Sequence, residues 1–154
     1  LMKSIDQVKE RLHRLLDEQL FAALATCTEA GGLHSTLVAF TVTADLAKVY
    51  ICTGRNTRKF NHLNQTPIAS LLVHNYRNQC PDITTATAVS ITGEARELHG
   101  EARTEARRLH AHKHPQLADF VHSPNTALFE IAVASYNVVV NFQDVTVVEI
   151  KQER

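Results

Sequence analysis

The feature that most constrains the fold is a series of short apolar segments, rich in β-branched residues and separated by brief polar turns. Residues 20–28 and 33–43 flank a turn that contains Gly31 and Gly32, and this combination is typical of a β-hairpin. Successive strands joined by such short turns favour an antiparallel barrel over a parallel sheet. The other predicted strands cover residues 48–53, 68–74, 83–98, 126–142 and 145–150.

Helices are predicted before and between these strands. Ser4 is positioned to cap a helix that extends to Gln19, because apolar residues recur there at three- and four-residue spacing. Gly93 lies inside a predicted strand and indicates a bulge. The periodicity therefore indicates an α+β fold that is rich in strands. The remaining predicted helices lie within residues 54–65, 101–114 and 116–122.

Length and composition describe an ordinary globular chain, and we expect one domain over residues 1–154. The 16 basic residues balance the 16 acidic ones, so there is no general electrostatic reason to bind nucleic acid or an anionic membrane. No apolar stretch approaches the roughly 18 residues of a transmembrane helix, and the charged N-terminal segment lacks a signal peptide's apolar core. Three cysteines without paired spacing favour a reducing compartment, and we expect a cytoplasmic protein.

The strongest candidate site is residues 53–59, which read Thr-Gly-Arg-Asn-Thr-Arg-Lys. Three cations fall within five residues, between the end of a predicted strand and the start of a predicted helix. Backbone N–H groups and the helix dipole favour an anion at such a position, and arginine and lysine both bind phosphate oxygens. Composition alone leaves a phosphate site and a solvated basic turn about equally open.

A histidine-rich segment, residues 110–114, is a second candidate. On a helix, His110 and His114 share one face, as a pair of metal ligands would. No carboxylate or cysteine falls beside them at ligand spacing. We therefore expect no metal site, and we interpret the segment as a helix C-terminus that carries favourable cations.

Five stretches occur in an order that is typical of one protein family. They read Leu-Ala-Thr at 24–26, Gly-Leu-His-Ser-Thr-Leu-Val at 32–38, Tyr-Ile-Cys-Thr-Gly at 50–54, Thr-Arg-Lys at 57–59 and Pro-Ile-Ala-Ser-Leu-Leu-Val at 67–73. With them, the chain resembles the pyridoxamine 5′-phosphate oxidase-like, FMN-binding split-barrel superfamily over nearly all of residues 5–150. The resemblance implies an α+β fold, namely a β-rich, mainly antiparallel split β-barrel of six to seven strands with flanking helices.

The resemblance also implies FMN as cofactor, bound at the interface of a homodimer. In this superfamily the turn at 57–59 grips the FMN phosphate, the end of the preceding strand lines the cofactor site, and the strand after the first hairpin runs beside the flavin ring. The cofactor-binding residues implied in this way are Thr57, Arg58 and Lys59 for the phosphate, Cys52 and Thr53 for the strand end, and Ser35, Thr36, Leu37 and Val38 beside the ring.

The sequence departs from the oxidase after which the superfamily is named. That enzyme has arginine at the position of Thr36, its Arg-Gln pair aligns with Thr87 and Ala88, and its C-terminal Arg and His motif is absent here. We therefore expect an FMN-dependent oxidoreductase that acts on an unidentified small molecule other than pyridoxamine phosphate, with catalytic residues that the sequence does not identify. The alternatives are a non-enzymatic flavin carrier or sensor, a relative that binds haem or a deazaflavin, and a structural dimer with a vestigial site.

Overall fold

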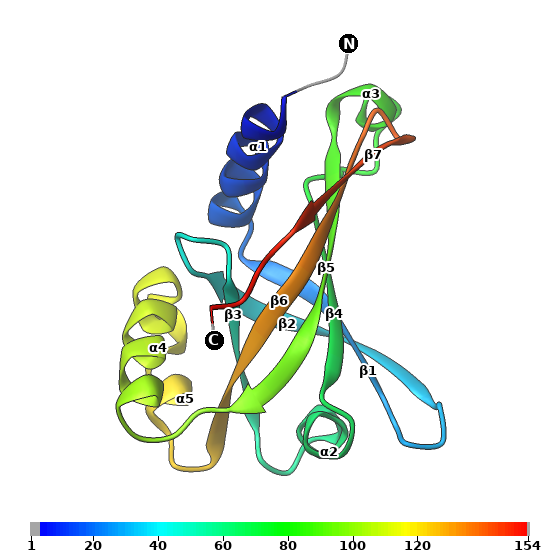
Figure 1. The fold of residues 1–154 in the computed structure, drawn as a ribbon. Coiled ribbons are helices and arrows are strands. Elements are labelled where there is room, and N and C mark those ends of the chain that lie inside the picture. The colour runs from blue at the N-terminus through cyan, green and yellow to red at the C-terminus, as the bar shows by residue number, and fades with distance from the viewer. Residues whose placement is uncertain (1–3, 154) are drawn as a thin grey trace.

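A closed six-stranded antiparallel barrel forms the centre of the structure, a computed structural model that describes residues 4–153. The barrel closes because β3 pairs with β2 on one side and with β6 on the other. β7 pairs with the far part of β6 and adds a seventh strand outside the barrel, so the predicted fold class is confirmed (Figure 1). The strands are β1 Phe21–Cys27, β2 Leu33–Val42, β3 Lys48–Gly54, β4 Ile68–His74, β5 Thr87–Glu97, β6 Thr126–Val140 and β7 Asp144–Glu149.

The helices cover the ends and one side of the barrel. In Figure 1, α1 lies toward the top, α2 closes the bottom, and α4 with α5 forms a separate layer beside β3 and β6. None of the helices within residues 4–153 is long and apolar enough to cross a bilayer. The helices are α1 Ile5–Glu18, α2 Arg58–Gln65, α3 Asp82–Thr85, α4 Gly100–Lys113 and α5 Ala118–His122, with a 3₁₀ turn over Pro115–Leu117.

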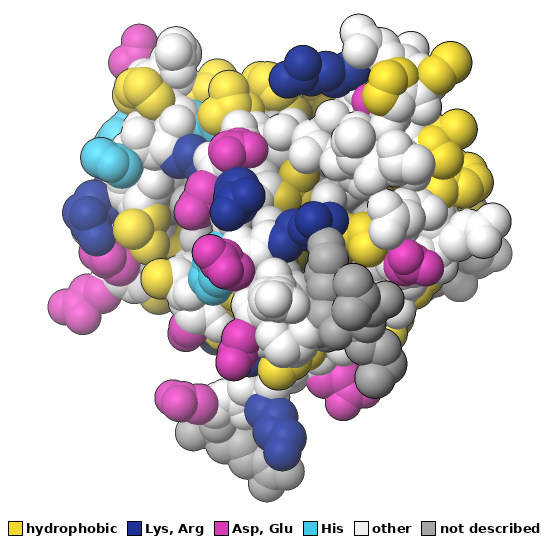
Figure 2. Space-filling view, turned by 90° about the horizontal axis from the view of Figure 1, so that it is seen from above, with side chains coloured by type: hydrophobic (Ala, Val, Ile, Leu, Met, Phe, Trp, Pro, Cys, Tyr) yellow, Lys and Arg dark blue, Asp and Glu magenta, His cyan; other side chains and the backbone are white. Residues whose placement is uncertain are grey.

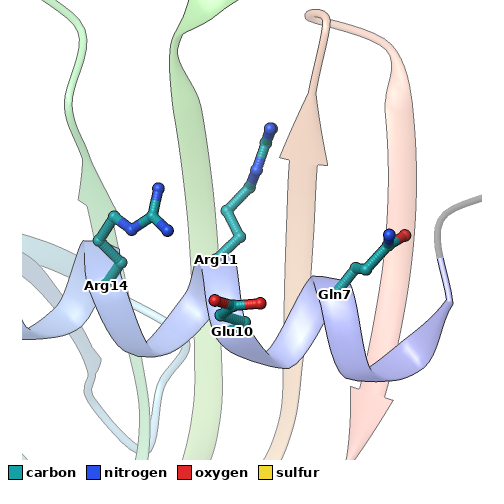
Figure 3. Close-up of a pocket in the computed structure, with 4 residues that line it drawn as sticks. All are labelled: Gln7, Glu10, Arg11 and Arg14. Carbon is teal, nitrogen blue, oxygen red and sulfur yellow. The ribbon is translucent and has the colours of Figure 1, made fainter.

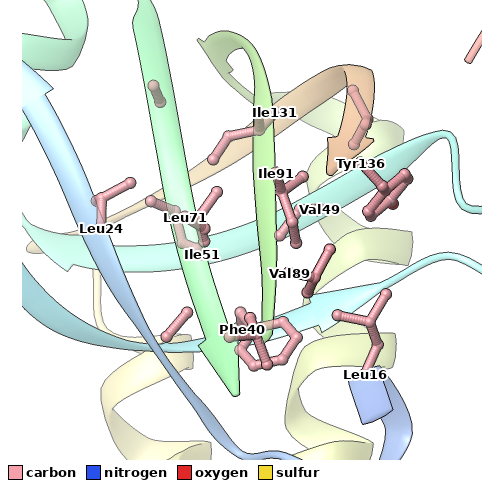
Figure 4. Close-up of a cluster of buried hydrophobic side chains, with 14 of the residues drawn as sticks. Leu16, Leu24, Phe40, Val49, Ile51, Leu71, Val89, Ile91, Ile131 and Tyr136 are labelled. Carbon is pink, nitrogen blue, oxygen red and sulfur yellow. The ribbon is translucent and has the colours of Figure 1, made fainter. Parts of the chain in front are cut away.

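Two apolar clusters hold these layers together. The larger fills the barrel with side chains from every second position of the strands, as Leu24, Phe40, Ile51 and Leu71 show in Figure 4. The smaller lies on the outside of β3 and β6, beneath α4 and α5; its buried members are Tyr50, Cys52, Leu98, Ala106, Val121 and Leu128. The outer faces of β3 and β6 are therefore buried as well as the inner ones.

The first helix begins where the sequence predicts. The Ser4 side chain accepts a hydrogen bond from the Gln7 backbone N–H, and the Gln7 side chain accepts one from the Ser4 backbone N–H. This reciprocal capping box satisfies two backbone donors that a helix start leaves free. The buried face of α1 then joins the barrel core through Val8, Leu12, Leu15 and Leu16.

Two predicted strand boundaries are wrong. The strand expected from residue 83 begins at Thr87, because the Asp82 carboxylate accepts backbone N–H groups of Arg77 and Gln79 (2.7 and 2.9 Å) and holds residues 82–85 in a helical turn. The strand expected to reach residue 142 ends at Val140, since Asn141 and Phe142 have positive φ angles of 50° and 62°. That left-handed backbone reverses the chain into β7.

The charge distribution on the surface agrees with the balanced composition. Figure 2, a view from above relative to Figure 1, shows Lys and Arg side chains intermingled with Asp and Glu on the same face. Hydrophobic side chains gather along one edge of this view. This face therefore offers no broad field of one sign.

Hydrogen bonds from the C-terminal end of α4 connect it to β2 and to α1, and they correct the interpretation of the histidine-rich segment. His110 Nδ1 lies 2.9 Å from Thr41 Oγ1, and His114 Nε2 lies 2.8 Å from the Phe40 carbonyl oxygen. Lys113 Nζ donates to the Leu16 carbonyl oxygen (2.8 Å) and lies over the Phe40 ring. Both histidines are buried, so they are not solvated cations at a helix end. Burial, and next the neighbouring His114 and Lys113, lowers the pKa of His110 to about 4.

The predicted bulge lies at Gly93. The β5–β6 register shifts between Thr92 and Gly93, and Ala134 is the extra residue on the facing strand. A Cβ atom at Gly93 would overlap the Ala132 carbonyl group and lie 2.8 Å from Ile131 Cγ2. Glycine is therefore required by the close approach of β6.

We predict that Gly93→Ala lowers the free energy of unfolding by about 2–3 kcal/mol, the cost of overpacking a site that cannot expand. Urea unfolding followed by circular dichroism measures this change. Ser90→Ala, on the same strand, is the matched control and should change the free energy by less than about 0.5 kcal/mol. Equal effects of the two substitutions would contradict the packing seen at the bulge.

We also predict an acid-sensitive stability that depends on His110. Its pKa is about 4 in the folded chain against 6.5 ordinarily, so the unfolded chain binds more protons between these values. Stability then rises with pH through that window and is lost as the pH falls from about 6.5 to 4, by up to about 3 kcal/mol. Urea unfolding at several pH values should show a shallower loss in His110→Gln, whereas parallel curves for both proteins would refute the assignment.

Candidate functional site

The turn between β3 and α2 is rigidly built. Thr57 caps α2: its hydroxyl accepts from the Phe60 backbone N–H (3.3 Å) and lies 2.8 Å from the Gly54 carbonyl oxygen. The same hydroxyl lies 2.7 Å from Thr53 Oγ1. The Thr57 hydroxyl therefore shapes the turn, and the first backbone N–H groups of α2 remain available to an anion.

The three cations of this turn have different surroundings. The Arg55 guanidinium forms an ion pair with Glu97 and lies over the Phe60 ring, while its backbone N–H donates to the Asn125 carbonyl oxygen. Arg58 is exposed, whereas Lys59 is half-buried and lines a pocket. Arg55 therefore links the turn to β5 and to the start of β6, and Lys59 is the cation best placed for a ligand.

The pocket beside Lys59 has a volume of about 390 Å³, within the range of small-molecule sites. Its floor is the outer face of β2 and β3, where Ala39 and Cys52 lie, and Leu37 lies at its exposed side. Its far wall comes from the segment between β5 and β6. The lining residues are Leu37, Val38, Ala39, Cys52, Thr53, Gly54, Asn56, Thr57, Lys59, His110, Leu117 and Phe120.

Most of the sequence-predicted site residues come together in this pocket. Six of the nine line it, namely Leu37, Val38, Cys52, Thr53, Thr57 and Lys59. Ser35, Thr36 and Arg58 do not line it; Ser35 and Arg58 are exposed, and Thr36 is half-buried on β2. These three residues stay predictions from the resemblance and lie outside this pocket.

Sequence reasoning missed the far wall. His110, Leu117 and Phe120 come from α4, the 3₁₀ turn and α5. The local signal for His110 was its i, i+4 spacing with His114, which suggested a metal pair rather than a pocket wall. No short-range pattern relates these residues to β2, which lies about 70 positions earlier in the chain.

Cys52 is a thiol in the pocket floor. Burial raises its pKa to about 12, against the opposing effect of the Arg103 charge. The protonated form is therefore overwhelmingly populated at neutral pH, and the side chain acts as a small apolar surface rather than as a nucleophile.

Three other hollows formed by residues within 4–153 lack this combination of cation and apolar wall. One lies on the exposed face of α1, where Gln7, Glu10, Arg11 and Arg14 all come from the same helix (Figure 3). A polar pocket of about 540 Å³ lies between the end of α1 and the β4–β5 loop, and includes Arg77. Beside it, an apolar groove of about 480 Å³ runs past Phe21, Ala23, Leu37 and Leu72.

Solved structures of the same fold come from several bacteria. A haem-binding protein from Mycobacterium smegmatis matches with a TM-score of 0.81 and 15% identity, covering 97% of this chain and 59% of that one. HutZ, a haem storage protein from Vibrio cholerae, matches at 0.72 and 13%, over 90% and 95% of the two chains. General stress protein 26 from Bacillus anthracis matches at 0.70 and 17%, over 94% and 99%. The chain therefore spans less than two thirds of the M. smegmatis protein and most of the other two.

Sequence comparisons bear on the family. Comparison with curated protein sequences gives no match. The family model for pyridoxamine 5′-phosphate oxidase matches residues 8–139. This range covers the six barrel strands, apart from the last residue of β6, and does not include β7. The chain therefore belongs to the pyridoxamine 5′-phosphate oxidase family.

Proposed function

We propose that this protein binds FMN in the pocket beside Lys59 and acts as an oxidoreductase on a small molecule. The observation that carries the proposal is the position of Lys59 and the α2 N-terminus at the rim of an apolar pocket. The lysine and the helix N-terminus suit a phosphate group, and the apolar pocket suits a planar heterocycle. Bound flavin would supply the electron-transfer chemistry, and the protein would supply position and electrostatics.

The chemistry of the pocket residues fits such a cofactor. Lys59 and the free backbone N–H groups at the start of α2 offer positive charge and hydrogen-bond donors at one side. Leu37, Leu117 and Phe120 offer apolar surface at the other. The Thr53–Thr57 contact (2.7 Å) and the Arg55–Glu97 ion pair hold the turn in place before a ligand arrives, so little ordering would be needed on binding.

We expect a substrate other than pyridoxamine phosphate. Thr36 stands where the family's namesake has a charged donor, and it does not line the pocket here. The pocket residues include a buried imidazole, His110, and a buried thiol, Cys52, but no carboxylate. A substrate that carries a second phosphate would therefore find no second cation among these residues.

A homodimer with the pocket beside its interface is part of the proposal. Ala23 pairs with Leu37 on β2 and with Leu72 on β4, so these three side chains form an apolar row across the outer face of three strands. Leu37 is 69% exposed and Leu72 is 44% exposed. Phe21, also exposed, extends the patch, which is of the kind that marks a protein interface. Leu37 belongs to this row and to the pocket, so a partner on the row would cover the open side of the pocket.

Haem is the second candidate ligand. Two proteins of the same fold are described as haem-binding and haem-storing, and His110 supplies an imidazole in the pocket wall. Haem iron is commonly held by a histidine. The absorption spectrum of the purified protein distinguishes the two ligands, because flavin absorbs in two bands in the blue and near ultraviolet whereas haem gives a strong Soret band.

We predict that Lys59→Ala weakens FMN binding about 10- to 100-fold, the loss expected for one charge-assisted hydrogen bond. Quenching of FMN fluorescence during titration measures the dissociation constant. Adding Arg58→Ala should weaken binding further, but by a smaller factor, since Arg58 is exposed and outside the pocket. Arg14→Ala, which removes an exposed cation from α1, is the control and should leave the constant unchanged. Normal affinity in the Arg58/Lys59 double variant would refute the phosphate site.

We predict that Leu72→Lys converts a dimer into a monomer, because burying an unpaired ammonium in an apolar interface is strongly unfavourable. Size-exclusion chromatography with light scattering measures the mass. Val145→Lys, an exposed apolar position on β7, should leave the dimer intact. A monomeric wild-type protein, or a Leu72→Lys variant that remains dimeric, would exclude this interface.

A further inference from the structure

His110 is the one buried polar side chain in the far wall of the pocket. It is 1% exposed, and its Nδ1 atom lies 2.9 Å from Thr41 Oγ1. Thr41 pairs with Tyr50 across β2 and β3, and Tyr50 belongs to the apolar cluster beneath α4. Among the described residues, no protein group forms a hydrogen bond with His110 Nε2. The ring is therefore fixed through one nitrogen and has the other free, in a residue that lines the pocket.

The partners of two neighbouring histidines differ in a way that matters for their tautomers. His114 Nε2 lies 2.8 Å from the Phe40 carbonyl oxygen, and a carbonyl only accepts, so His114 must carry its proton on Nε2. His110 contacts the Thr41 hydroxyl, which both donates and accepts. The partner of His114 therefore determines which ring nitrogen carries the proton. The partner of His110 leaves both positions open.

The Thr41–His110 pair has two arrangements of equal charge. In one, Nδ1–H donates to Thr41 Oγ1 and Nε2 accepts from the pocket. In the other, the Thr41 hydroxyl donates to Nδ1 and Nε2–H donates to the pocket. Passing from the first to the second, one proton leaves Nδ1 for water and one is taken up at Nε2 from water, so the net charge of the pair stays at zero.

We propose that His110, with Thr41, is a cofactor-contacting residue that offers the bound ligand either a hydrogen-bond donor or an acceptor, according to the ligand's redox state. This inference rests on the proposed function. When a redox-active heterocycle is reduced, a ring atom that accepted a hydrogen bond gains a proton and becomes a donor. A protein group beside that atom then meets an acceptor in the oxidised state and a donor in the reduced state. A fixed donor such as lysine serves one state only, whereas a neutral histidine held by a hydroxyl serves both.

Other observations around the ring are consistent with a neutral imidazole in this role. The His114 ring lies 4.8 Å from the His110 ring, and Lys113 is adjacent on α4. Burial, and next the proximity of His114 and Lys113, disfavours an imidazolium and keeps the pKa of His110 well below neutrality. The pair therefore contributes hydrogen bonding to the pocket without adding a charge to it.

The chain contains a matched control pair. Thr26 Oγ1 lies 3.0 Å from His62 Nδ1, and both residues are buried. This pair joins β1 to α2, and neither residue lines the pocket. It reproduces the chemistry of Thr41 and His110 away from the ligand.

The test measures two quantities in the FMN-loaded protein. The first is the dissociation constant for oxidised FMN, and the second is the midpoint potential of the bound flavin, which reports the ratio of affinities for its reduced and oxidised forms. The variants are Thr41→Val and His110→Phe, with Thr26→Val as the control. We expect His110→Phe to raise the dissociation constant about 3- to 10-fold. We expect Thr41→Val to change the affinity ratio at least 3-fold, about 14 mV for two electrons, and Thr26→Val to change neither quantity.

A spectroscopic measurement on the wild-type protein tests the assignment without any substitution. Nitrogen-15 NMR distinguishes the two neutral tautomers of histidine, and we expect the His110 signals to change tautomer between oxidised and reduced FMN while those of His62 do not. The same His110 tautomer in both states, or unchanged constants and potentials in both variants, would overturn the His110 assignment and leave FMN binding intact. Failure of the wild-type protein to bind FMN would overturn the proposed function and this inference together.

Discussion

The pairing of β3 with β6 is the constraint on which the rest of the structure depends. It runs from Lys48 opposite Ala132 to Gly54 opposite Thr126, and it converts an open sheet into a closed barrel. The ladder ends where the basic turn begins, and the Arg55 N–H bond to the Asn125 carbonyl continues it by one step. Because β6 must return to β3, the connection from β5 has to pass outside the barrel, and α4 and α5 lie on that path. The pocket is the space between this connection and the strand ends that the closure brings together.

The proposed roles of the three cations in the turn follow from this geometry rather than from their residue types. Arg55 faces β5 and is neutralised by Glu97, so its charge stabilises the turn. Lys59, in the first turn of α2, lines the pocket. Arg58, between the two in position along the chain, is exposed to solvent. A basic sequence motif therefore combines a structural ion pair, a pocket-lining lysine and a surface charge within five residues.

Much of the fold and about half of the pocket could be predicted from the sequence, and the remainder could not for identifiable reasons. Alternation in the strands, the Ser4 cap and the glycine at the bulge are short-range signals, and each appears where expected. The start of β5 could not be predicted because the Asp82 carboxylate accepts backbone N–H groups three and five residues away and stabilises a turn. The apolar residues near Ile83 do not show whether the chain forms a turn or a strand there. The position of His110 in the pocket wall could not be predicted because its partner, Thr41, is 69 residues distant. Histidines four residues apart lie on one face of a helix. Their spacing does not show whether that face contacts solvent, a metal ion or a strand.

The length of β6 has a consequence for how the chain reaches this structure. β6 pairs with β3, β5 and β7, and its contacts with β3 join residues more than 70 positions apart in the chain. Closing so large a loop precedes any gain from the contacts it permits, which slows folding. During synthesis, β1 to β5 would therefore emerge with two unpaired sheet edges, at β3 and β5, and with the Leu37–Ala23–Leu72 row uncovered. Until residue 140 has left the ribosome, the strand that completes the native barrel is missing, and the exposed edges of β3 and β5 are open to pairing with other chains.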